Sequence, residues 1–242
     1  MQENMPNSKS KAAPNSVESL LEYLKEDFFP RHGTKIIVVL LIIAAGVFAV
    51  VQRIGESAQR DLAQTEELGK ALDYIYTGKG DSALITLETS MQNKSFKGLT
   101  LAKAALLAGN LHLQNNNLDG AELLYKTTIS NAGSVEIISS AAEHGLAVVA
   151  MERQNYSEAI SLLNAFVNKH GKRTGNLAKR HAKTEPVDAV PTVPDALWKL
   201  SLCYLETGDK ELAAQTAQKI LKIYGDSSKA AYAQKLIAAV EK

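Results

Sequence analysis

Four short segments with one pattern recur beyond residue 80, and they constrain the fold more than any other feature of the chain. Each segment, GDSA, LDGA, YSEA or KELA, places an alanine early in a predicted helix after a polar turn. These marker alanines, Ala83, Ala121, Ala159 and Ala213, lie 38, 38 and 54 residues apart. A period of this size predicts a solenoid of stacked helix pairs, since one pair alone cannot bury its apolar face.

Small residues also recur at a fixed distance before the marker alanines. Twelve residues earlier stand Ala71, Gly109, Ala147 and Ser201, and four residues later stand Leu87, Tyr125, Leu163 and Ala217. Two antiparallel helices can cross closely only where both facing surfaces carry small side chains, with bulkier apolar residues around the contact. The pattern therefore predicts an all-α repeat domain over residues 61–242, in agreement with only six prolines in the whole chain.

Glycines are predicted to mark several helix ends. Gly225 is expected to end one helix, and the stretch Ser228–Val240, with apolar residues at helical spacing, is expected to form a capping helix. The tripeptide Gly78–Gly80 lacks the spacing and the preceding strand of a phosphate-binding loop. We therefore interpret it as a turn between two helices.

An insertion, Gly171–Pro194 (residues 171–194), explains the longer last interval because it breaks the helical periodicity. Counting Lys169, it carries six lysines or arginines, no acidic residue before Glu185, and three prolines, which cannot occupy helix interiors. We expect a long, mobile loop. It could contact anionic lipid headgroups or an acidic partner, or it could be a solvated insertion without a ligand. Because no aromatic residues alternate with its charges and the net charge of the chain is only +1, nucleic acid is not an expected partner.

From Ile36 to Val51 the chain has sixteen consecutive residues without a charged or strongly polar side chain. A helix needs about 20 residues to cross about 30 Å of hydrocarbon, and Lys35 and Arg53 can reach the headgroups from the ends of the run. The run predicts a transmembrane helix over residues 34–54. A cleaved signal peptide is the main alternative, but the preceding 35 residues are long for its N-terminal region and no convincing small-x-small cleavage site follows.

The residues before this run divide into two parts. Residues 1–16 form a polar leader that is predicted to be disordered. Residues 17–29 carry five apolar side chains at helical spacing and predict a short amphipathic helix, either an interfacial anchor or a cytoplasmic contact element. Basic residues beside the apolar run are balanced in number, and only Lys9 and Lys11 favour a cytoplasmic N-terminus.

No arrangement typical of catalysis or metal binding is present in the sequence. The five histidines show no HExxH spacing, since Glu143 and His144 lack a second histidine. The single cysteine, Cys203, has no evident base within a helical turn and is expected to be a buried structural thiol. We therefore predict a protein with no enzymatic activity, no cofactor and no metal site.

The markers GLA and YSEA on either side of a polar turn resemble the tetratricopeptide repeat. The resemblance extends from Leu62 to Gly225 with a period about four residues longer than the usual 34, which implies longer helices or loops. In that family the ligand groove is lined by the first helix of each pair, at positions fifteen, eleven and eight residues before the marker alanine. These positions are occupied here by Leu68, Leu72, Ile75, Leu106, Asn110, Leu113, His144, Val148, Met151, Trp198, Leu202 and Leu205.

Ten of these twelve residues are apolar. The resemblance therefore implies a groove that accepts a hydrophobic segment or an amphipathic helix of a partner. Alternatively, the same residues belong to the core and are covered by the Ser228–Val240 helix or by a second copy of the chain.

The layout of the whole chain is similar to that of the YfgM-like ancillary subunits of the bacterial Sec translocon (SecYEG). The similarity rests on SVESLLEYLKEDF at Ser16–Phe28, on the apolar run followed at once by a charged helix, and on the repeats from Leu62 onward. It implies a single-pass inner-membrane protein with a cytoplasmic N-terminus and a periplasmic repeat domain. Its expected partners are translocon subunits, a membrane-bound periplasmic chaperone, client polypeptides and membrane lipid. A structural scaffold of another envelope assembly, such as a division or secretion complex, is the alternative.

Overall fold

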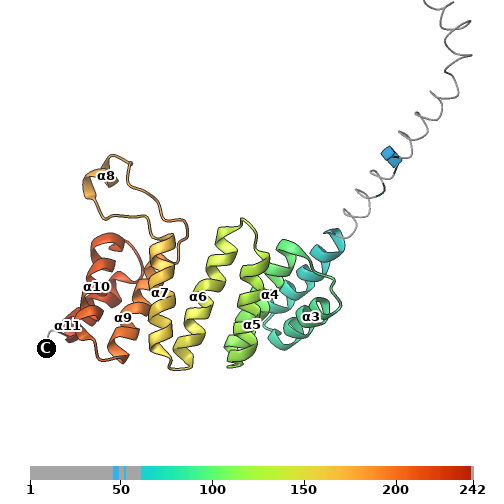
Figure 1. The fold of residues 1–242 in the computed structure, drawn as a ribbon, viewed down its shortest axis with the longest axis horizontal. Coiled ribbons are helices and arrows are strands. Elements are labelled where there is room, and N and C mark those ends of the chain that lie inside the picture. The colour runs from blue at the N-terminus through green and yellow to red at the C-terminus, as the bar shows by residue number, and fades with distance from the viewer. Residues whose placement is uncertain (1–45, 49–51, 53–60, 241–242) are drawn as a thin grey trace, which may run out of the picture. The chain divides into compact units, whose positions relative to one another are not determined.

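The computed structural model describes residues 46–48, 52 and 61–240, and every regular element in this part is an α-helix (Figure 1). The helix over residues 61–76 is followed by α3 (Gly80–Gln92), α4 (Gly98–Gln114), α5 (Leu118–Asn131), α6 (Glu136–Glu152), α7 (Tyr156–His170), α8 (Leu177–His181), α9 (Val193–Glu206), α10 (Lys210–Tyr224) and α11 (Ala230–Val240). The prediction of a helical solenoid over the repeat region is therefore confirmed.

The N-terminal predictions lie outside the described residues. This applies to the leader (1–16), to the amphipathic helix (17–29) and to all of the predicted transmembrane helix (34–54) except residues 46–48 and 52. Within the part of the chain that is described, no helix is both long enough and apolar enough to cross a membrane.

Four helix pairs are joined internally by turns with the same geometry. The pairs are helix 61–76 with α3, α4 with α5, α6 with α7, and α9 with α10. The middle residue of each turn has a left-handed backbone: Gly78 (φ 73°), Asn116 (φ 56°), Gln154 (φ 58°) and Gly208 (φ 83°). In three of the turns the next residue, Asn117, Asn155 or Asp209, caps the second helix by accepting a backbone N–H with its side chain. The interpretation of Gly78–Gly80 as a turn is thus confirmed.

The packing confirms the predicted register of the repeats. All four marker alanines are completely buried, and so are Ala71, Ala147 and Ser201 twelve residues before them. Gly109, the fourth member of that series, is buried against Tyr125. The long period comes partly from long helices, since α4 and α6 have 17 residues each.

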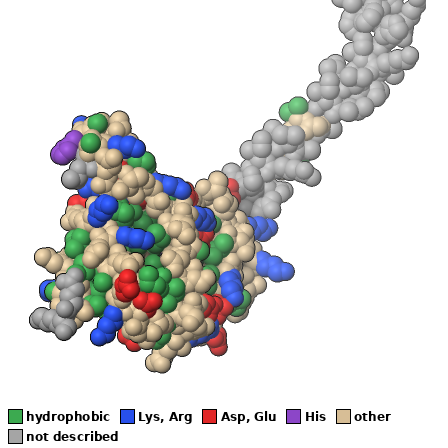
Figure 2. Space-filling model, turned by 60° about the vertical axis from the view of Figure 1, so that its left-hand side comes forward, with side chains coloured by type: hydrophobic (Ala, Val, Ile, Leu, Met, Phe, Trp, Pro, Cys, Tyr) green, Lys and Arg blue, Asp and Glu red, His purple; other side chains and the backbone are tan. Residues whose placement is uncertain are grey.

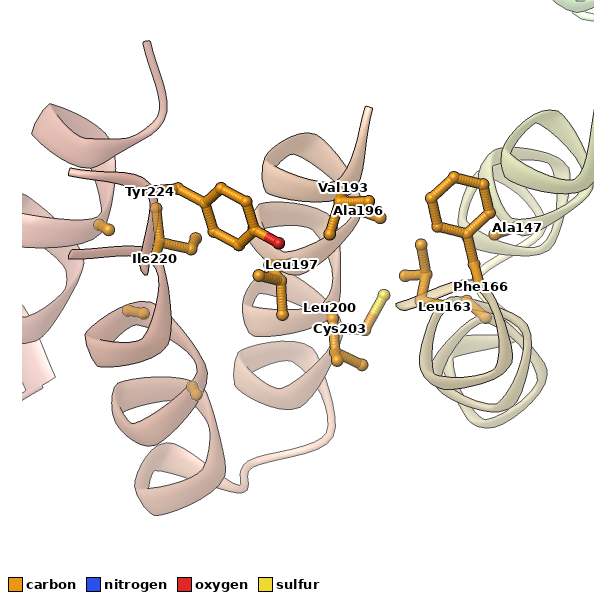
Figure 3. Packing of buried hydrophobic residues seen from close by; sticks show 14 of the residues in the cluster. Ala147, Leu163, Phe166, Val193, Ala196, Leu197, Leu200, Cys203, Ile220 and Tyr224 are labelled. Atoms are coloured by element: carbon orange, nitrogen blue, oxygen red, sulfur yellow. The ribbon is translucent and has the colours of Figure 1, made fainter. Parts of the chain in front are cut away.

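Among the described residues, the largest core cluster lies between α7, α9 and α10 (Figure 3). Leu163 and Phe166 of α7 meet one side of α9, while Ile220 and Tyr224 of α10 meet the other. Cys203 is completely buried in this cluster, and its burial raises the pKa of the thiol to about 11. A thiol in this environment is poorly suited to act as a nucleophile, as expected from the sequence.

Helix α11 packs against α10 and caps the solenoid, burying Ala233 and Leu236. It begins at Ala230, two residues after the predicted start. The preceding helix ends at Tyr224, and Gly225 follows it with a right-handed backbone (φ −60°). A side chain at Gly225 would place its Cβ 2.9 Å from the carbonyl oxygen of Leu221, so glycine is favoured there because the backbone approaches closely.

The insertion is organised by contacts that the sequence analysis did not predict. Glu185 accepts the backbone N–H groups of Thr174, Gly175 and Asn176, and its carboxylate lies 2.8 Å from Nε of Arg180. Arg180 also donates to the carbonyl oxygen of Ile223 in α10 at 2.8 Å. The expectation of a loop without regular structure was wrong for α8. Helix α9 also begins at Val193 rather than after Pro194, because proline is tolerated in the first turn of a helix.

Candidate protein-binding face

The twelve residues predicted to line a ligand groove come from four successive first helices, three from each, and we call them the first-helix strip. They belong to helix 61–76, α4, α6 and α9. Leu68 is buried and 9% exposed, whereas the other eleven residues are partly or fully exposed. Leu72 is the most exposed apolar residue among them, at 45%. Several others, including Met151 and Leu202, also pack against the core, so the strip combines core and surface roles.

Tyr125 reaches the strip from the second helix α5. Its ring lies between two glycines, since a Cβ added at Gly145 would lie 2.6 Å from the ring Cζ and one at Gly109 would lie 3.0 Å from Cε1. The hydroxyl donates to Oδ1 of Asn110 at 2.9 Å. Burial raises the pKa of Tyr125 to about 12, so this donor keeps its proton at neutral pH. Asn110 was predicted to bind a partner, but its side-chain oxygen is already engaged by the core.

His144 of the strip also has partners inside the domain. Its Nε2 lies 3.1 Å from Oδ2 of Asp195 in α9, and its ring centroid lies 5.7 Å from that of Phe166. Asp195 also forms ion pairs with Lys199 and Lys229, each at 2.8 Å. His144, Lys199 and Lys229 hold the pKa of Asp195 well below its usual range, against the opposing effect of burial. His144 therefore contributes to the junction between the last two helix pairs and the segment before α11.

The two ends of the strip differ in their exposure. At the C-terminal end, the ring of Trp198 lies 5.7 Å from the ring of Tyr232 in α11, so the predicted cover by the capping helix is present there. At the N-terminal end, Leu72 is accompanied by Tyr76, one residue beyond the strip, which is 93% exposed. The open apolar surface is therefore concentrated on helix 61–76.

One edge of the strip becomes acidic along the solenoid. In each of the four first helices, the residue directly after the last strip residue is exposed. These residues are, in chain order, Tyr76, Gln114, Glu152 and Glu206. Glu152 and Glu206 are also the last residues of α6 and α9. Neither makes an ion pair with another described residue.

Half of the basic residues assigned to the insertion are neutralised within the domain. Lys169 pairs with Glu143, Arg173 with Asp226 at 3.3 Å, and Arg180 with Glu185 at 2.8 Å. Lys172, Lys179 and Lys183 form no such pair with described residues. Lysine and arginine side chains lie on the projecting insertion and beside it, with apolar side chains between them (Figure 2). The positive charge available to an anionic partner is thus smaller than the sequence suggested.

His170, at the end of α7, is a buried polar residue that the sequence analysis did not single out. Its side chain is 0% exposed, and its two ring nitrogens lie 2.8 Å from Glu136 and 2.8 Å from Glu143. Each nitrogen therefore faces a carboxylate of α6, which ties the two helices of the third pair together. Among the described residues, no group of three or more histidine, cysteine or acidic side chains has an arrangement that could hold a metal ion.

A pocket of about 360 Å³, which we call the insertion pocket, lies where the insertion meets α9 and α10. It is lined by Arg173, Val187, Asp188, Ala189, Val190, Pro191, Pro194 and Tyr224. No motif in the sequence indicates this pocket, because its lining comes from three separate segments. The run of valines and prolines after Glu185 is the one local signal that could have indicated an apolar surface in this basic insertion.

Comparison with known proteins agrees with this geometry. Residues 195–227 match the family "Tetratricopeptide repeat". Curated protein sequences include no match to the chain. A solved tetratricopeptide repeat protein from Parabacteroides merdae is 18% identical, with a TM-score of 0.55, over 74% of this chain and 60% of that one. The chain therefore spans less than two thirds of that protein's length.

Two further solved structures have similar scores. A Podosopora anserina protein described as a kinesin light chain with nearly identical TPR-like repeats is 17% identical with a TM-score of 0.53, over 73% of this chain and 84% of that one. MamA AMB-1 is 16% identical with a TM-score of 0.51, over 74% of this chain and 81% of that one. At sequence identities of 16–18%, these similarities show a shared fold and nothing more. The repeat region of this chain therefore has the helical-solenoid fold of tetratricopeptide repeat proteins, and its residues 195–227 match that family in sequence.

Proposed function

We propose that this chain is a membrane-anchored protein-binding module without a catalytic role, whose first-helix strip accepts an apolar segment or an amphipathic helix of a partner protein. The observation that carries the proposal is the exposed apolar surface on helix 61–76, where Leu72 is 45% and Tyr76 is 93% exposed. Clustered exposed apolar residues mark interaction sites more often than single ones do. The fold supports the proposal, because tetratricopeptide-type repeats generally serve as protein-interaction modules.

The partner that we propose is the bacterial Sec translocon together with a membrane-bound periplasmic chaperone and client polypeptides. The chain would be a single-pass inner-membrane protein with a cytoplasmic N-terminus and a periplasmic repeat domain. The supporting features are the apolar run Ile36–Val51 and the YfgM-like layout of the chain. A structural scaffold of another envelope assembly is the second candidate, because it would use the same anchor and the same strip.

Co-purification of the full chain in mild detergent tests both the proposed binding surface and the proposed partner. The double variant Leu72→Asp with Tyr76→Asp should lose translocon subunits, because it places two charges on the open apolar surface. Ile85→Asp with Leu123→Asp is the matched control, since these apolar residues are 65% and 66% exposed but lie on second helices. The control should retain the partners.

Two results would count against the proposal. If the Leu72 and Tyr76 double variant folds and still binds, the open end of the strip has no part in recognition. If the wild-type chain forms a detergent-stable complex that contains no translocon subunit, the scaffold candidate is favoured. Leu106→Asp with Met151→Asp is less informative, because both side chains also pack against the core and their replacement is expected to destabilise the domain.

A further inference from the structure

The insertion pocket is separate from the first-helix strip and lies between the insertion and the helices α9 and α10. Its floor is formed by Val190 and Tyr224, which are 1% and 3% exposed, together with Pro194 from the first turn of α9. Its outer wall includes Val187, which is 79% exposed. A volume of about 360 Å³ lies at the small end of the range for ligand sites, which is about 300–1,000 Å³. A pocket of this size can hold one large aliphatic or aromatic side chain together with part of the backbone that carries it.

The polar edge of the pocket includes the cation of Arg173 and the carboxylate of Asp188, which also interacts with the hydroxyl of Tyr224. Asp188 accepts the backbone N–H groups of Lys172 and Arg173 at 2.7 and 2.8 Å, so its Oδ1 is occupied. The guanidinium of Arg173 lies over the ring of Tyr224, 5.6 Å from its centroid, and bonds weakly to Asp226 at 3.3 Å. Among the described residues, the guanidinium makes no other hydrogen bond, so several of its five donors are available to a ligand.

The charges around Arg173 indicate what kind of acceptor the ligand presents. Two carboxylates already lie at this edge: Asp226 pairs with the guanidinium at 3.3 Å, and Asp188 lines the pocket, where it accepts the backbone N–H of Arg173. A third anion would be repelled by them, whereas a neutral carbonyl oxygen would accept a hydrogen bond from Arg173 without adding charge. An uncharged peptide group therefore fits this edge better than a carboxylate or a phosphate does.

The walls of the pocket are held in place before any ligand arrives. Glu185, whose side chain is only 7% exposed, fastens the base of the insertion through three backbone N–H groups and Arg180. At Gly175 (φ +70°) the insertion approaches α10 so closely that an added Cβ would lie 3.0 Å from the carbonyl oxygen of Lys222. Ala189 donates its N–H to the carbonyl oxygen of His170 at 3.2 Å. A pocket that is pre-formed in this way loses little entropy when it binds.

We propose that the insertion pocket binds one large apolar residue of an extended polypeptide segment. The side chain packs against Val190, Pro194 and Tyr224, and the carbonyl oxygen of the same segment accepts a hydrogen bond from Arg173. This gives the chain a second contact for a protein partner, independent of the first-helix strip. It also gives the insertion a role other than binding anionic headgroups.

Titration of the full chain with N-acetyl-leucine methylamide tests the proposal, with methyl NMR signals as the readout. The Val187 and Val190 methyl signals should shift in a saturable manner, while those of Leu87, which is buried in α3, should not move. N-acetyl-glycine methylamide lacks the side chain and should cause no saturable shift. N-acetyl-leucine with a free carboxylate should bind more weakly than the methylamide, because its charge is repelled.

Variants identify the two parts of the site. Val187→Asp should abolish the shifts at Val190 without unfolding the chain, since Val187 is 79% exposed. Arg173→Gln should weaken binding about tenfold, as expected for the loss of a hydrogen bond from a charged donor. Lys179→Gln is the matched control, because this cation lies on α8 and does not line the pocket.

Comparing the three small-molecule probes on the wild-type chain tests the proposal even if a variant unfolds. Equal shifts with the glycine and leucine probes would overturn the proposal, because the side chain would then not be recognised. Tighter binding of the free carboxylate would also overturn it, since the site would then select an anion. The absence of saturable shifts up to the solubility limit of the leucine methylamide would mean that the pocket does not bind a peptide residue.

Discussion

The contact of Tyr125 with two glycines shows how single residues determine the spacing of the helix pairs. The sequence pattern identified Gly109 because it lies twelve residues before a marker alanine. Gly145 begins the GLA marker, but the pattern did not indicate that it faces the same ring from the next pair. A pattern within one pair cannot reveal a contact between pairs, because the partner residue is then set by how the pairs stack.

Gly145→Ala should destabilise the domain by about 1–3 kcal/mol, because the new methyl group would lie 2.6 Å from Cζ of Tyr125. Urea unfolding monitored by circular dichroism measures the change. Gly69→Ala is the matched control, since nothing lies within 4 Å of its added Cβ in helix 61–76. It should stabilise by up to about 1 kcal/mol through helix propensity. A loss of stability at Gly69, or none at Gly145, would contradict this packing.

Asp195 is expected to give the domain a stability that depends on pH. Its pKa is depressed in the folded state, first by His144 and then by Lys199 and Lys229. A carboxyl group of this kind stabilises the fold fully above its unfolded pKa of about 3.9, and this contribution is lost as the pH falls below that value. Asp195→Asn should therefore cost about 1–3 kcal/mol near neutral pH. The difference from wild type should shrink in unfolding experiments below about pH 4, and a constant difference would exclude this linkage.

At the scale of elements, the sequence predicted the regular features and missed those formed by distant contacts. The turns within pairs were predictable because their signals are local, such as Gly78 before α3 and Asp209 as the cap of α10. The structure of the insertion was not, because Arg180 bonds to Ile223 and Arg173 to Asp226, residues 43 and 53 positions away. The strip could be located by register, and cover by the capping helix could be proposed, but the contact of Trp198 with Tyr232 at one end of the strip could not be predicted.

Helices α6 and α9 both end on a glutamate, and this is expected to reduce their stability. The C-terminus of a helix carries a partial negative charge, and neither Glu152 nor Glu206 has a cationic partner among the described residues. Glu206→Gln should therefore stabilise the domain by about 0.3–1 kcal/mol in thermal unfolding at low salt. The gain should decrease in high salt, and a destabilised variant would show that the carboxylate has an unrecognised role. Glu211→Gln is the control, because Glu211 lies in the first turn of α10, where a negative charge stabilises the helix. This variant should lower the stability of the domain.

At the scale of the whole molecule, the proposed topology places the repeat domain across the membrane from the N-terminus. Single cysteines at Ser10 and at the exposed Ser228 can be labelled in intact cells with a membrane-impermeant thiol reagent. Cys203 can remain in place, because it is completely buried and its pKa is raised to about 11. Ser228→Cys should react after the outer membrane is made permeable, and Ser10→Cys should react only after cell lysis. Labelling of Ser10→Cys alone in intact cells would reverse the proposed orientation.

The identical left-handed turns within the four pairs have a practical consequence for engineering. A residue added at Asn116 or Gln154 would shift the cap that starts the second helix and disturb the whole pair. The chain itself carries its long insertion between α7 and α9, at a junction between pairs. A fluorescent reporter or an affinity tag should therefore be tolerated at the exposed junction residues 133–134, and it should disrupt folding at residues 115–117 or 153–155.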